Sequence, residues 1–275
     1  MTTESPDAVA ACCSTLYGSP LAELLVGESF HPGGLEGTRE LLASSGIGPG
    51  AQLLDVGCGL GASAQVAATE FGLRVHGVDT SAPIVARAMA RSGDARVHWS
   101  TASLPHLPFA DASFDAVLAE CVLSTVDRPA ALTELRRVLR PGGSLLLSDV
   151  VVSGEPIPEL DHRIIGAALC VTDAWRPGEM DACLSDAGFR VTGRWDRSAS
   201  IVALIERIDA RLSIMRLAAR DLGLDLGSLI GPAVAGIDDL PTPELADSVL
   251  AGVRAAVQDG SLGYTAITAS SGGPL

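Results

Sequence analysis

Between residues 50 and 155 the chain alternates two patterns of hydrophobic and polar positions. Short apolar runs that end in glycine or polar residues are typical of buried strands, and apolar residues spaced three or four apart are typical of helices. The runs that predict five strands are AQLLDVGCG, GLRVHGVDT, ARVHWSTAS, FDAVLAECVLS and SLLLSDVVV. Helical spacing occurs in SAPIVARAMARSG and RPAALTELRRVLRPGG, and we expect Pro141 and the glycines after it to end the second helix.

Two more strands are predicted near the C-terminal side, in GFRVTGRWDRS and GYTAITAS. Strands that alternate with helices build βαβ units, in which the strands run parallel and the helices cover both faces of the sheet. The sequence therefore predicts an α/β fold with a doubly wound seven-stranded sheet, which is a Rossmann-like core.

The segments outside this repeat are predicted to be helical. Residues 1–50 form an N-terminal leader with a turn at HPGG and a short helix, GTRELLASSG, that ends at Gly46. We expect this leader to act as a lid over the α/β core, which is assigned to residues 51–199. Residues 200–259 form a helical insertion, and residues 260–275 hold the last strand and the tail.

The insertion contains two helices. The first is SIVALIERIDARLSIMRLAARDLG. The second has Thr242 as its N-cap and Pro243 at its first helical position, and it ends at Gly260. Two roles fit these helices, covering the active site or pairing subunits into a homodimer, and the pattern does not choose between them.

Composition and charge narrow the class of protein. Hydrophobic residues make up 47% of the chain, which is ample for a core, and the formal net charge is −14. An acidic surface repels phosphate backbones and anionic lipid, which argues against nucleic-acid and membrane partners. No apolar run reaches the roughly 18 residues of a membrane span. The first residues, MTTESPDAVA, lack a basic segment before an apolar one, so we expect a cytoplasmic protein.

A glycine-rich turn is the clearest candidate for a binding site. The segment LLDVGCGLGAS places Asp55, Gly57, Gly59 and Gly61 where the first strand turns into a helix. Glycine lets a backbone turn tightly and approach a ligand without a Cβ in the way. Asp79 ends the second strand, where it can accept hydrogen bonds from ribose hydroxyls. Dinucleotide-binding enzymes use a similar turn, so this block alone does not identify the cofactor.

These blocks, joined by LPFADASFDAV and VLRPGGSLLLSD, resemble the class I S-adenosylmethionine (SAM)-dependent methyltransferases over residues 50–195. The RPGG segment is not a feature of NAD enzymes. The resemblance implies that SAM is the cofactor, that the glycine turn cradles its methionine part, and that Asp79 holds its ribose. We also place Tyr17, Thr80 and Glu120 at the cofactor site.

The chain departs from this family at the adenine contact. Many members have an aspartate after the third strand that binds the adenine amino group. The matching position here is Ser103, followed by Leu104. A hydroxyl and a backbone N–H can still bind adenine, so both residues stay in the expected cofactor site.

Two cysteines are candidates for binding the methyl acceptor. Cys121 follows the fourth strand and Cys170 follows the fifth by about twenty residues. Ligands of open parallel sheets bind beyond the carboxyl ends of the strands, so both thiols should lie where the methyl group is presented. The segments AECVLSTVDRPAALTELRRVLRPGGSLLLSDVVV and ALCVTDAW resemble arsenite methyltransferases. That resemblance implies that Cys121 and Cys170 hold As(III), and it leaves open whether Cys12, Cys13 or neither is a third ligand.

The chemistry of arsenic fits thiols. Trivalent arsenic is soft and binds thiolates strongly. Its lone pair is itself the nucleophile, so transfer needs no general base and depends on holding the reactants in line. Glu120 and His162 are the possible acid or base groups, and the sequence favours a solvated or structural role for each.

Each of these side chains also has a structural interpretation. Cys121 and Cys170 are compatible with small buried residues that line an organic pocket, and His31 and Trp175 with either pocket walls or packing. Two other cysteines are expected to be structural, one in the glycine turn and one in GEMDACLSDAGF: Cys58 and Cys183. The chain has no CxxC pair, which argues against a zinc site.

The sequence therefore predicts a SAM-dependent methyltransferase that methylates thiol-bound trivalent arsenic. The alternative is a methyltransferase for a small organic acceptor in specialised metabolism, for which the helices of residues 200–259 would shape a pocket. A third hypothesis is a thiol sensor that keeps the fold without catalysis. The expected partners are a small-molecule or metalloid substrate and a second copy of the chain.

Overall fold

The computed structural model describes residues 20–154, 170–171, 173–221 and 243–272. Strands and helices alternate along the chain through β5, except that β4 follows β3 without a helix between them. The elements are α2 (Pro20–Val26), α3 (Gly34–Ser44), β1 (Gln52–Val56), α4 (Ala62–Phe71), β2 (Arg74–Asp79), α5 (Ala82–Arg91), β3 (Val97–Thr101), β4 (Phe114–Glu120), the 3₁₀ turn η1 (Leu123–Thr125), α6 (Arg128–Val138), β5 (Leu139–Val152), α8 (Glu179–Asp186), β6 (Phe189–Asp196), α9 (Ala199–Asp221), α11 (Pro243–Gln258) and β7 (Leu262–Ser271).

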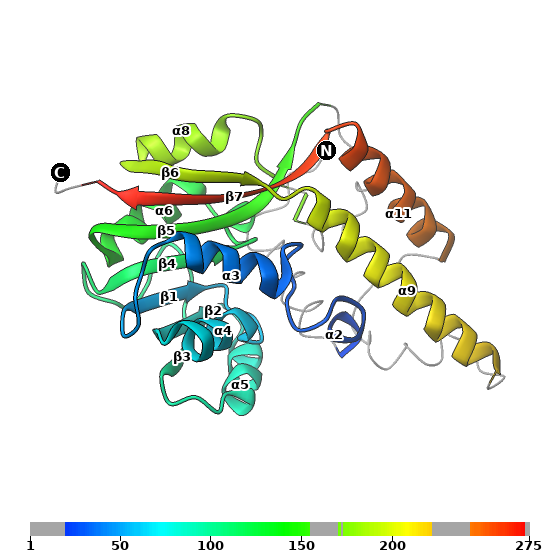
Figure 1. Cartoon of the computed structure of the whole chain (residues 1–275), viewed down its shortest axis with the longest axis horizontal. Helices are drawn as coiled ribbons and strands as arrows, with labels where there is room; N and C mark the ends of the chain where they lie inside the picture. The colour runs from blue at the N-terminus through cyan, green and yellow to red at the C-terminus, as the bar shows by residue number, and fades with distance from the viewer. Residues whose placement is uncertain (1–19, 155–169, 172, 222–242, 273–275) are drawn as a thin grey trace.

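The seven strands form one sheet in the order β3-β2-β1-β4-β5-β7-β6 (Figure 1). This confirms the predicted α/β class and the doubly wound sheet. Strands β1 to β5 pair in parallel, but β7 pairs antiparallel with both β5 and β6. The expectation of an entirely parallel sheet was therefore wrong. After β6, helices α9 and α11 lie beyond the carboxyl edge instead of crossing a face, so the chain re-enters from that edge and β7 runs backwards.

Each face of the sheet is covered by helices, because residues within a strand alternate between two cores. On β1, Leu53 packs with α3 and α4, whereas Leu54 packs with α6 and α8. Both leucine side chains are fully buried. The alternation leaves the carboxyl ends of β1, β2 and β4 as the place where polar residues can reach a ligand.

The RPGG segment behaves differently from the prediction. Helix α6 ends at Val138, before Pro141, and residues 139–143 already belong to β5. A Cβ on Gly143 would lie 2.9 Å from the carbonyl oxygen of Asp115, so only glycine lets β5 approach β4 this closely. The register between β4 and β5 shifts at this point. The glycines therefore serve strand pairing and do not end the helix.

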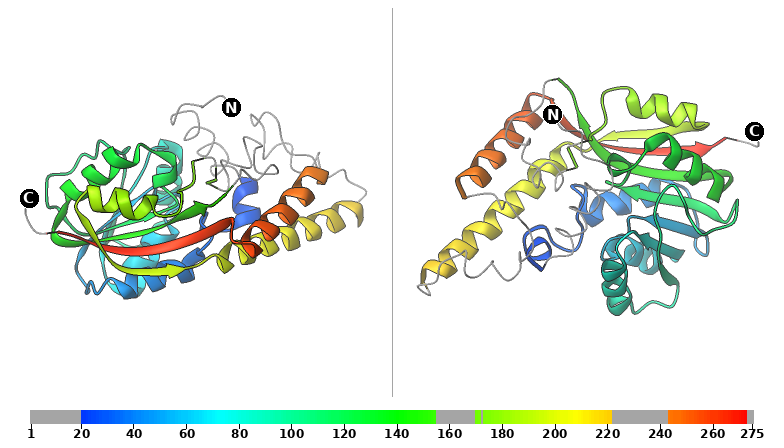
Figure 2. Two further views of the ribbon diagram at one scale, coloured as in Figure 1. Left: turned by 90° about the horizontal axis from the view of Figure 1, so that it is seen from above. Right: turned by 180° about the vertical axis from the view of Figure 1, so that it is seen from behind.

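The two predicted helices of the insertion are present, and α11 begins at Pro243. They pack side by side beyond the ends of β5 and β7 (Figure 2). A third apolar core lies beneath them and includes Ile205 of α9 and Val253 of α11. Arg211 of α9 also donates hydrogen bonds to the carbonyl oxygens of Leu24 (3.1 Å) and Leu25 (2.9 Å) in α2. The N-terminal segment and the insertion thus meet over the carboxyl edge.

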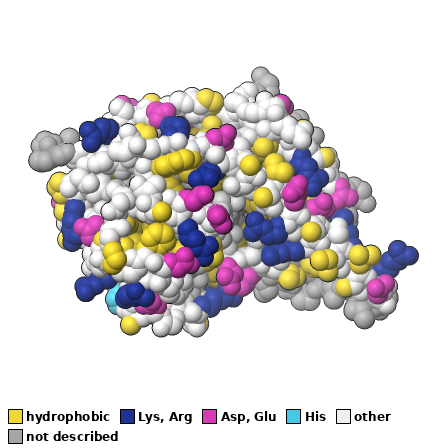
Figure 3. Space-filling view, in the orientation of Figure 1, with side chains coloured by type: hydrophobic (Ala, Val, Ile, Leu, Met, Phe, Trp, Pro, Cys, Tyr) yellow, Lys and Arg dark blue, Asp and Glu magenta, His cyan; other side chains and the backbone are white. Residues whose placement is uncertain are grey.

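The surface mixes both signs of charge (Figure 3). Several of these groups are paired, such as Arg39 with Glu70 at 2.8 Å. Within the described ranges no helix combines the length and the apolarity that crossing a lipid bilayer would need.

Candidate active site

A cavity of about 360 Å³ opens at the carboxyl edge of the sheet. Its walls come from the glycine turn after β1, the ends of β2 and β4, the loop after β3, and the segment before α3. Many of the residues that the sequence assigned to the cofactor line this cavity: Asp55, Gly57, Gly59, Asp79, Thr80, Ser103, Leu104 and Glu120. Gly61 belongs to the same turn, and Tyr17 lies outside the described residues.

The glycine turn needs its glycines for steric reasons. Gly57, Gly59 and Gly61 all have positive φ values, of 65°, 52° and 84°. A Cβ on Gly57 would lie 2.5 Å from Val122, and one on Gly61 would lie 2.2 Å from Trp99. Side chains at these positions would therefore clash as well as strain the backbone. The turn presents bare backbone to the cavity, as a cradle for a ligand requires.

Two aspartates flank the glycine turn, and they differ in their hydrogen-bond partners. The carboxylate of Asp79 accepts hydrogen bonds from the backbone N–H of Gly59 (3.1 Å) and of Ser81 (2.9 Å), which fixes its orientation. Asp55 is 3% exposed, and its Oδ2 has no hydrogen-bond partner in the described part of the chain. Burial, followed by the negative charges of Glu120 and Asp79, raises the pKa of Asp55 well above its ordinary value. A buried carboxyl oxygen without a donor beside a cavity fits a ligand that carries an ammonium group.

Glu120, the last residue of β4, is the centre of a buried polar network. Its Oε2 accepts hydrogen bonds from the hydroxyls of Ser63 (2.7 Å) and Thr38 (3.0 Å) and lies 3.2 Å from Nε2 of His31. Burial alone would raise the pKa of Glu120, but the charge of His31 and these hydrogen bonds hold it below its ordinary value. Glu120 is therefore an ionised carboxylate inside the protein.

His31 connects this carboxylate to β7. Its Nδ1 lies 3.5 Å from the hydroxyl of Tyr264, which donates a 2.7 Å hydrogen bond to Ser148 of β5. Its Nε2 contacts Glu120 but makes no hydrogen bond of good geometry within the described residues. Burial raises the pKa of Tyr264, so its hydroxyl stays protonated. Each ring nitrogen therefore has a polar neighbour, and a proton on Nε2 is stabilised by the carboxylate beside it.

Sequence reasoning missed this network. His31 was assigned to a wall or to packing, Tyr264 was not considered, and Glu120 was assigned to the cofactor and named as a possible acid or base. The three residues are brought together by strand order and by the path of the N-terminal segment, so no local spacing relates them. The one local signal was a histidine directly before a predicted turn, HPGG.

The two cysteines of the arsenic hypothesis meet beside this network. Cys121 and Cys170 both line the cofactor cavity and also a smaller apolar cavity next to it. Both have φ of +56°, which non-glycine residues adopt rarely and mostly where a site requires it. A hydrogen bond between the two thiols, followed by burial, raises the pKa of Cys121 well above its ordinary value. Cys12 and Cys13 lie outside the described residues.

Comparison with known protein families relates part of the chain to methyltransferases. Residues 54–147 match the sequence family described as "Methyltransferase domain". These residues include the glycine turn, Asp79 and Glu120, which form much of the cavity wall. This part of the chain is therefore similar to a methyltransferase domain. The cofactor predicted for it, S-adenosylmethionine, is the one that this class of domain uses.

Individual relatives of this methyltransferase domain act on organic molecules according to their names. The chain is 30% identical over 190 residues to phosphoethanolamine N-methyltransferase 1 of Arabidopsis thaliana, which covers 67% of this chain and 38% of that protein. It is 36% identical over 160 residues to O-methyltransferase resE of Aspergillus sclerotiorum, which covers 56% of this chain and 60% of that protein. The chain therefore spans less than two thirds of these relatives.

Solved structures show the same fold. Phosphoethanolamine N-methyltransferase 2 of Haemonchus contortus superimposes with a TM-score of 0.72 at 20% sequence identity. The match covers 98% of this chain and 61% of that chain. At this identity the likeness establishes the seven-stranded methyltransferase fold and leaves the acceptor open.

The remaining candidates lie away from the methyltransferase cavity or in its wall. Trp175 is fully buried, donates to Asp149 at 3.2 Å and stacks under Arg128, so packing is its role. Cys58 lies in the cavity wall, and burial raises the pKa of its thiol. Cys183 packs against the core beneath α8. His162 is outside the described ranges, and those ranges contain no cluster of three metal-binding side chains.

Proposed function

We propose that the protein is a methyltransferase that moves a methyl group from SAM to a hydroxyl group of a small organic acceptor. The observation that carries this proposal is the buried His31, whose Nε2 lies 3.2 Å from the carboxylate of Glu120 on the wall of the cofactor cavity. A hydroxyl is a weak nucleophile until a base removes its proton, and this pair supplies one. The likeness to an O-methyltransferase supports the same acceptor chemistry.

The cofactor end of the cavity suits SAM. Asp79 is oriented to bind ribose hydroxyls, and the free Oδ2 of Asp55 suits the ammonium of the methionine part. Ser103 and Leu104 line the cavity at the place expected for adenine. When bound, SAM supplies a sulfonium-activated methyl group, and the carboxylates of this cavity favour its positive charge.

The acceptor end is small and apolar. The adjoining cavity measures about 20 Å³ and is walled by Phe30, Val150, Ile201 and Leu204 together with the two cysteines. Such a wall favours an acceptor whose reactive hydroxyl is attached to an apolar body, because charged groups would lose hydration there. A phenol or a similar hydroxylated ring has this character, but the cavity described has room for about one water molecule, so a ring needs it to widen.

The transfer balances as a single displacement. The acceptor oxygen forms a bond to the methyl carbon while the bond from carbon to sulfur breaks, and its electron pair stays on sulfur to give S-adenosylhomocysteine (SAH). The hydroxyl proton moves to Nε2 of His31. Glu120, whose Oε2 lies 3.2 Å from the same nitrogen, stabilises the resulting imidazolium by its negative charge.

A methylation assay tests this function. The full chain is incubated with methyl-labelled SAM and a panel of phenols and catechols, with phosphoethanolamine as a nitrogen acceptor. We expect label in a methyl ether, and we expect His31→Gln to lower kcat by about 10² to 10⁴. The matched control is His98→Gln, at an exposed position on β3, which should keep full activity. A folded, SAH-binding protein that labels no hydroxyl would reject the proposal.

A second candidate function is methylation of trivalent arsenic. The contact between Cys121 and Cys170 at the edge of the cofactor cavity favours it, because paired thiols are good ligands for a soft ion. The named relatives act on organic molecules, and for this reason we place arsenic second.

Arsenite and labelled SAM separate the two functions. Under the arsenic hypothesis, Cys121→Ser and Cys170→Ser each abolish methylarsenic formation, Cys183→Ser does not, and His31→Gln changes little because no proton is removed. Under the hydroxyl hypothesis, His31→Gln is the damaging change and arsenite is not methylated. The pattern across these four variants therefore assigns the acceptor.

A further inference from the structure

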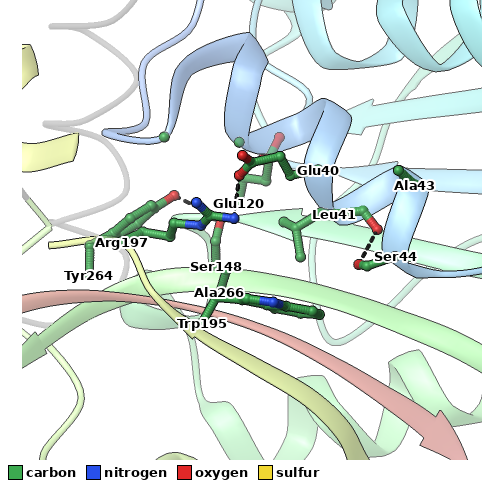
Figure 4. Close-up of a pocket in the computed structure, with 12 residues that line it drawn as sticks. Glu40, Leu41, Ala43, Ser44, Glu120, Ser148, Trp195, Arg197, Tyr264 and Ala266 are labelled. Carbon is green, nitrogen blue, oxygen red and sulfur yellow. Dashed lines mark hydrogen bonds and ion pairs between the residues drawn. The ribbon is translucent and has the colours of Figure 1, made fainter. Parts of the chain in front are cut away.

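A second cavity, of about 400 Å³, lies on the other side of Glu120. It is bounded by α3 and by the β5, β7 and β6 part of the sheet, and Figure 4 looks into it. Its exposed end carries the ion pair between Glu40 and Arg197. Its inner end is formed by Glu120, Ser148 and Tyr264. The proposed catalytic residues are therefore reached from two separate directions.

The second cavity has the properties of a water-filled space. A water molecule occupies about 30 Å³ in the liquid, so a cavity of about 400 Å³ has room for several. The inner wall offers a carboxylate and two hydroxyls, and the outer end offers a guanidinium. Apolar side chains, including Leu41, Trp195 and Ala266, form the rest of the wall, so ordered water is expected at its two polar ends.

Glu120 is shared by the two cavities. It lines the cofactor cavity together with His31, and it lines the second cavity together with Tyr264 and Ser148. The side chain of Glu120 is 6% exposed, so a proton on it can reach bulk solvent only through one of these spaces.

We propose that the proton released by methyl transfer leaves the protein through Glu120 and the second cavity. This inference rests on the proposed hydroxyl acceptor. Nε2 of His31, after taking the acceptor proton, hands it to Oε2 of Glu120 across 3.2 Å. The carboxyl group then gives it to water in the second cavity, which restores the imidazole and the carboxylate for the next turnover.

Tyr264 and Ser148 are positioning residues in this path. In the working tautomer the proton on Nδ1 of His31 is directed to the hydroxyl of Tyr264, which itself donates to Ser148. This series of hydrogen bonds keeps Nδ1 protonated and leaves Nε2 as the nitrogen that accepts and returns the proton. The cofactor side can then stay closed to water during transfer, which protects the reaction.

Substitutions that fill the second cavity test the proton path, and the measurement needs no methyl acceptor. Gly37 of α3 lines the cavity, and a Cβ built on it meets no atom within 4 Å, so Gly37→Leu places a side chain in the space without a clash. The matched control is Gly48→Leu, an exposed glycine whose Cβ is equally free and which lies outside the cavity. Ala43→Leu, at an exposed position lining the same cavity, is the second filling variant.

The readout is the exchange of the His31 ring protons with water. The full chain is labelled with ¹⁵N-histidine and saturated with SAH, and the His31 signals are those missing from His31→Gln. We expect exchange in Gly37→Leu to be slower by about tenfold, Ala43→Leu to change in the same direction, and Gly48→Leu to match the unmodified chain. Equal exchange in the folded filling variants and the unmodified chain would overturn the path.

The two proposals fail in different ways. Failure to methylate any hydroxyl rejects the proposed function, whatever the exchange rates. Unchanged exchange in the filled variants rejects only the exit path, because methyl transfer is not needed for that measurement.

Discussion

Two buried carboxyl groups in the cofactor cavity illustrate how neighbours set ionisation. Asp55 and Glu120 are both deeply buried, yet the pKa of Asp55 is raised and that of Glu120 is lowered. The difference lies in their partners, since Glu120 accepts bonds from Ser63 and Thr38 and contacts His31, whereas one oxygen of Asp55 has no donor. The residue without a donor is the one that gains most from a bound cation.

Proton release should accompany cofactor binding. In the free protein the raised pKa keeps Asp55 protonated at pH values above its ordinary pKa. The ammonium of SAM lowers the raised pKa because it stabilises the carboxylate. We therefore expect SAM binding to release protons, and its affinity to rise as pH increases through the raised pKa. Calorimetry in two buffers of different ionisation enthalpy measures the release. Asp55→Asn should remove the difference between the buffers, and a difference that persists in this variant would contradict the assignment.

Asp55 should lower the stability of the folded protein while it raises the affinity for SAM. Because the folded pKa of Asp55 is raised, its contribution to stability is lost as pH rises through that pKa. Asp55→Asn removes this cost, so we expect the free protein to melt higher at neutral pH, by about 2–4 °C for each kcal/mol gained. SAM affinity should fall in the same variant. Melting curves with and without SAM check both halves, and a lower Tm in the free variant would contradict the expectation.

At the scale of elements, the sequence predicted which segments are strands and helices better than it predicted their arrangement. The apolar runs identify all seven strands because strand and helix periodicities are local. The direction of β7 was not predictable, because the periodicity of α9 and α11 does not say whether they cross a face or stay at an edge. The RPGG glycines were misassigned because their role depends on contact with β4.

The candidate site also contains residues that the sequence predicted and residues that only the structure reveals. Asp79 and the glycine turn belong to contiguous motifs, so sequence alone was able to point to them. His31, Glu120 and Tyr264 come from three distant parts of the chain and are joined only by the order of strands. A side-chain network of this kind has no spacing rule, and it is visible only in the folded molecule.

The tie between α9 and α2 should hold the N-terminal side of the cavity in place. Arg211 donates to two carbonyl oxygens in the last turn of α2, where a cation also offsets the helix dipole. We expect Arg211→Ala to speed amide exchange in α2 by about tenfold, which corresponds to about 1.4 kcal/mol. Hydrogen exchange measures this, with Arg216→Ala on the same helix as the control. Unchanged exchange in α2 would show that other contacts hold it.

At the scale of the whole molecule, charge bears on how the cofactor binds. The chain carries a formal net charge of −14, and Asp55, Asp79 and Glu120 line one cavity. SAM has a sulfonium charge that SAH lacks, so the protein's field favours the substrate form of the cofactor over the product form. This bias assists product release.

Salt should therefore weaken SAM binding more than SAH binding. Ions screen the attraction between the acidic protein and the sulfonium, and SAH loses less because it is neutral overall. We expect the ratio of the two Kd values to approach one as NaCl is raised from about 0.05 M to about 0.5 M. Parallel titrations with both molecules measure it, and identical salt dependence would show that the cofactor charge is recognised only at short range.

The placement of β7 has a consequence for biosynthesis. This strand, translated after the other six, lies between β5 and β6 and pairs with both. Until residues 262–271 leave the ribosome, β5 and β6 each present an unpaired edge, and such edges join other chains readily. The nascent protein therefore completes its sheet only after residues 262–271 have emerged, and a chain truncated before Leu262 is expected to aggregate.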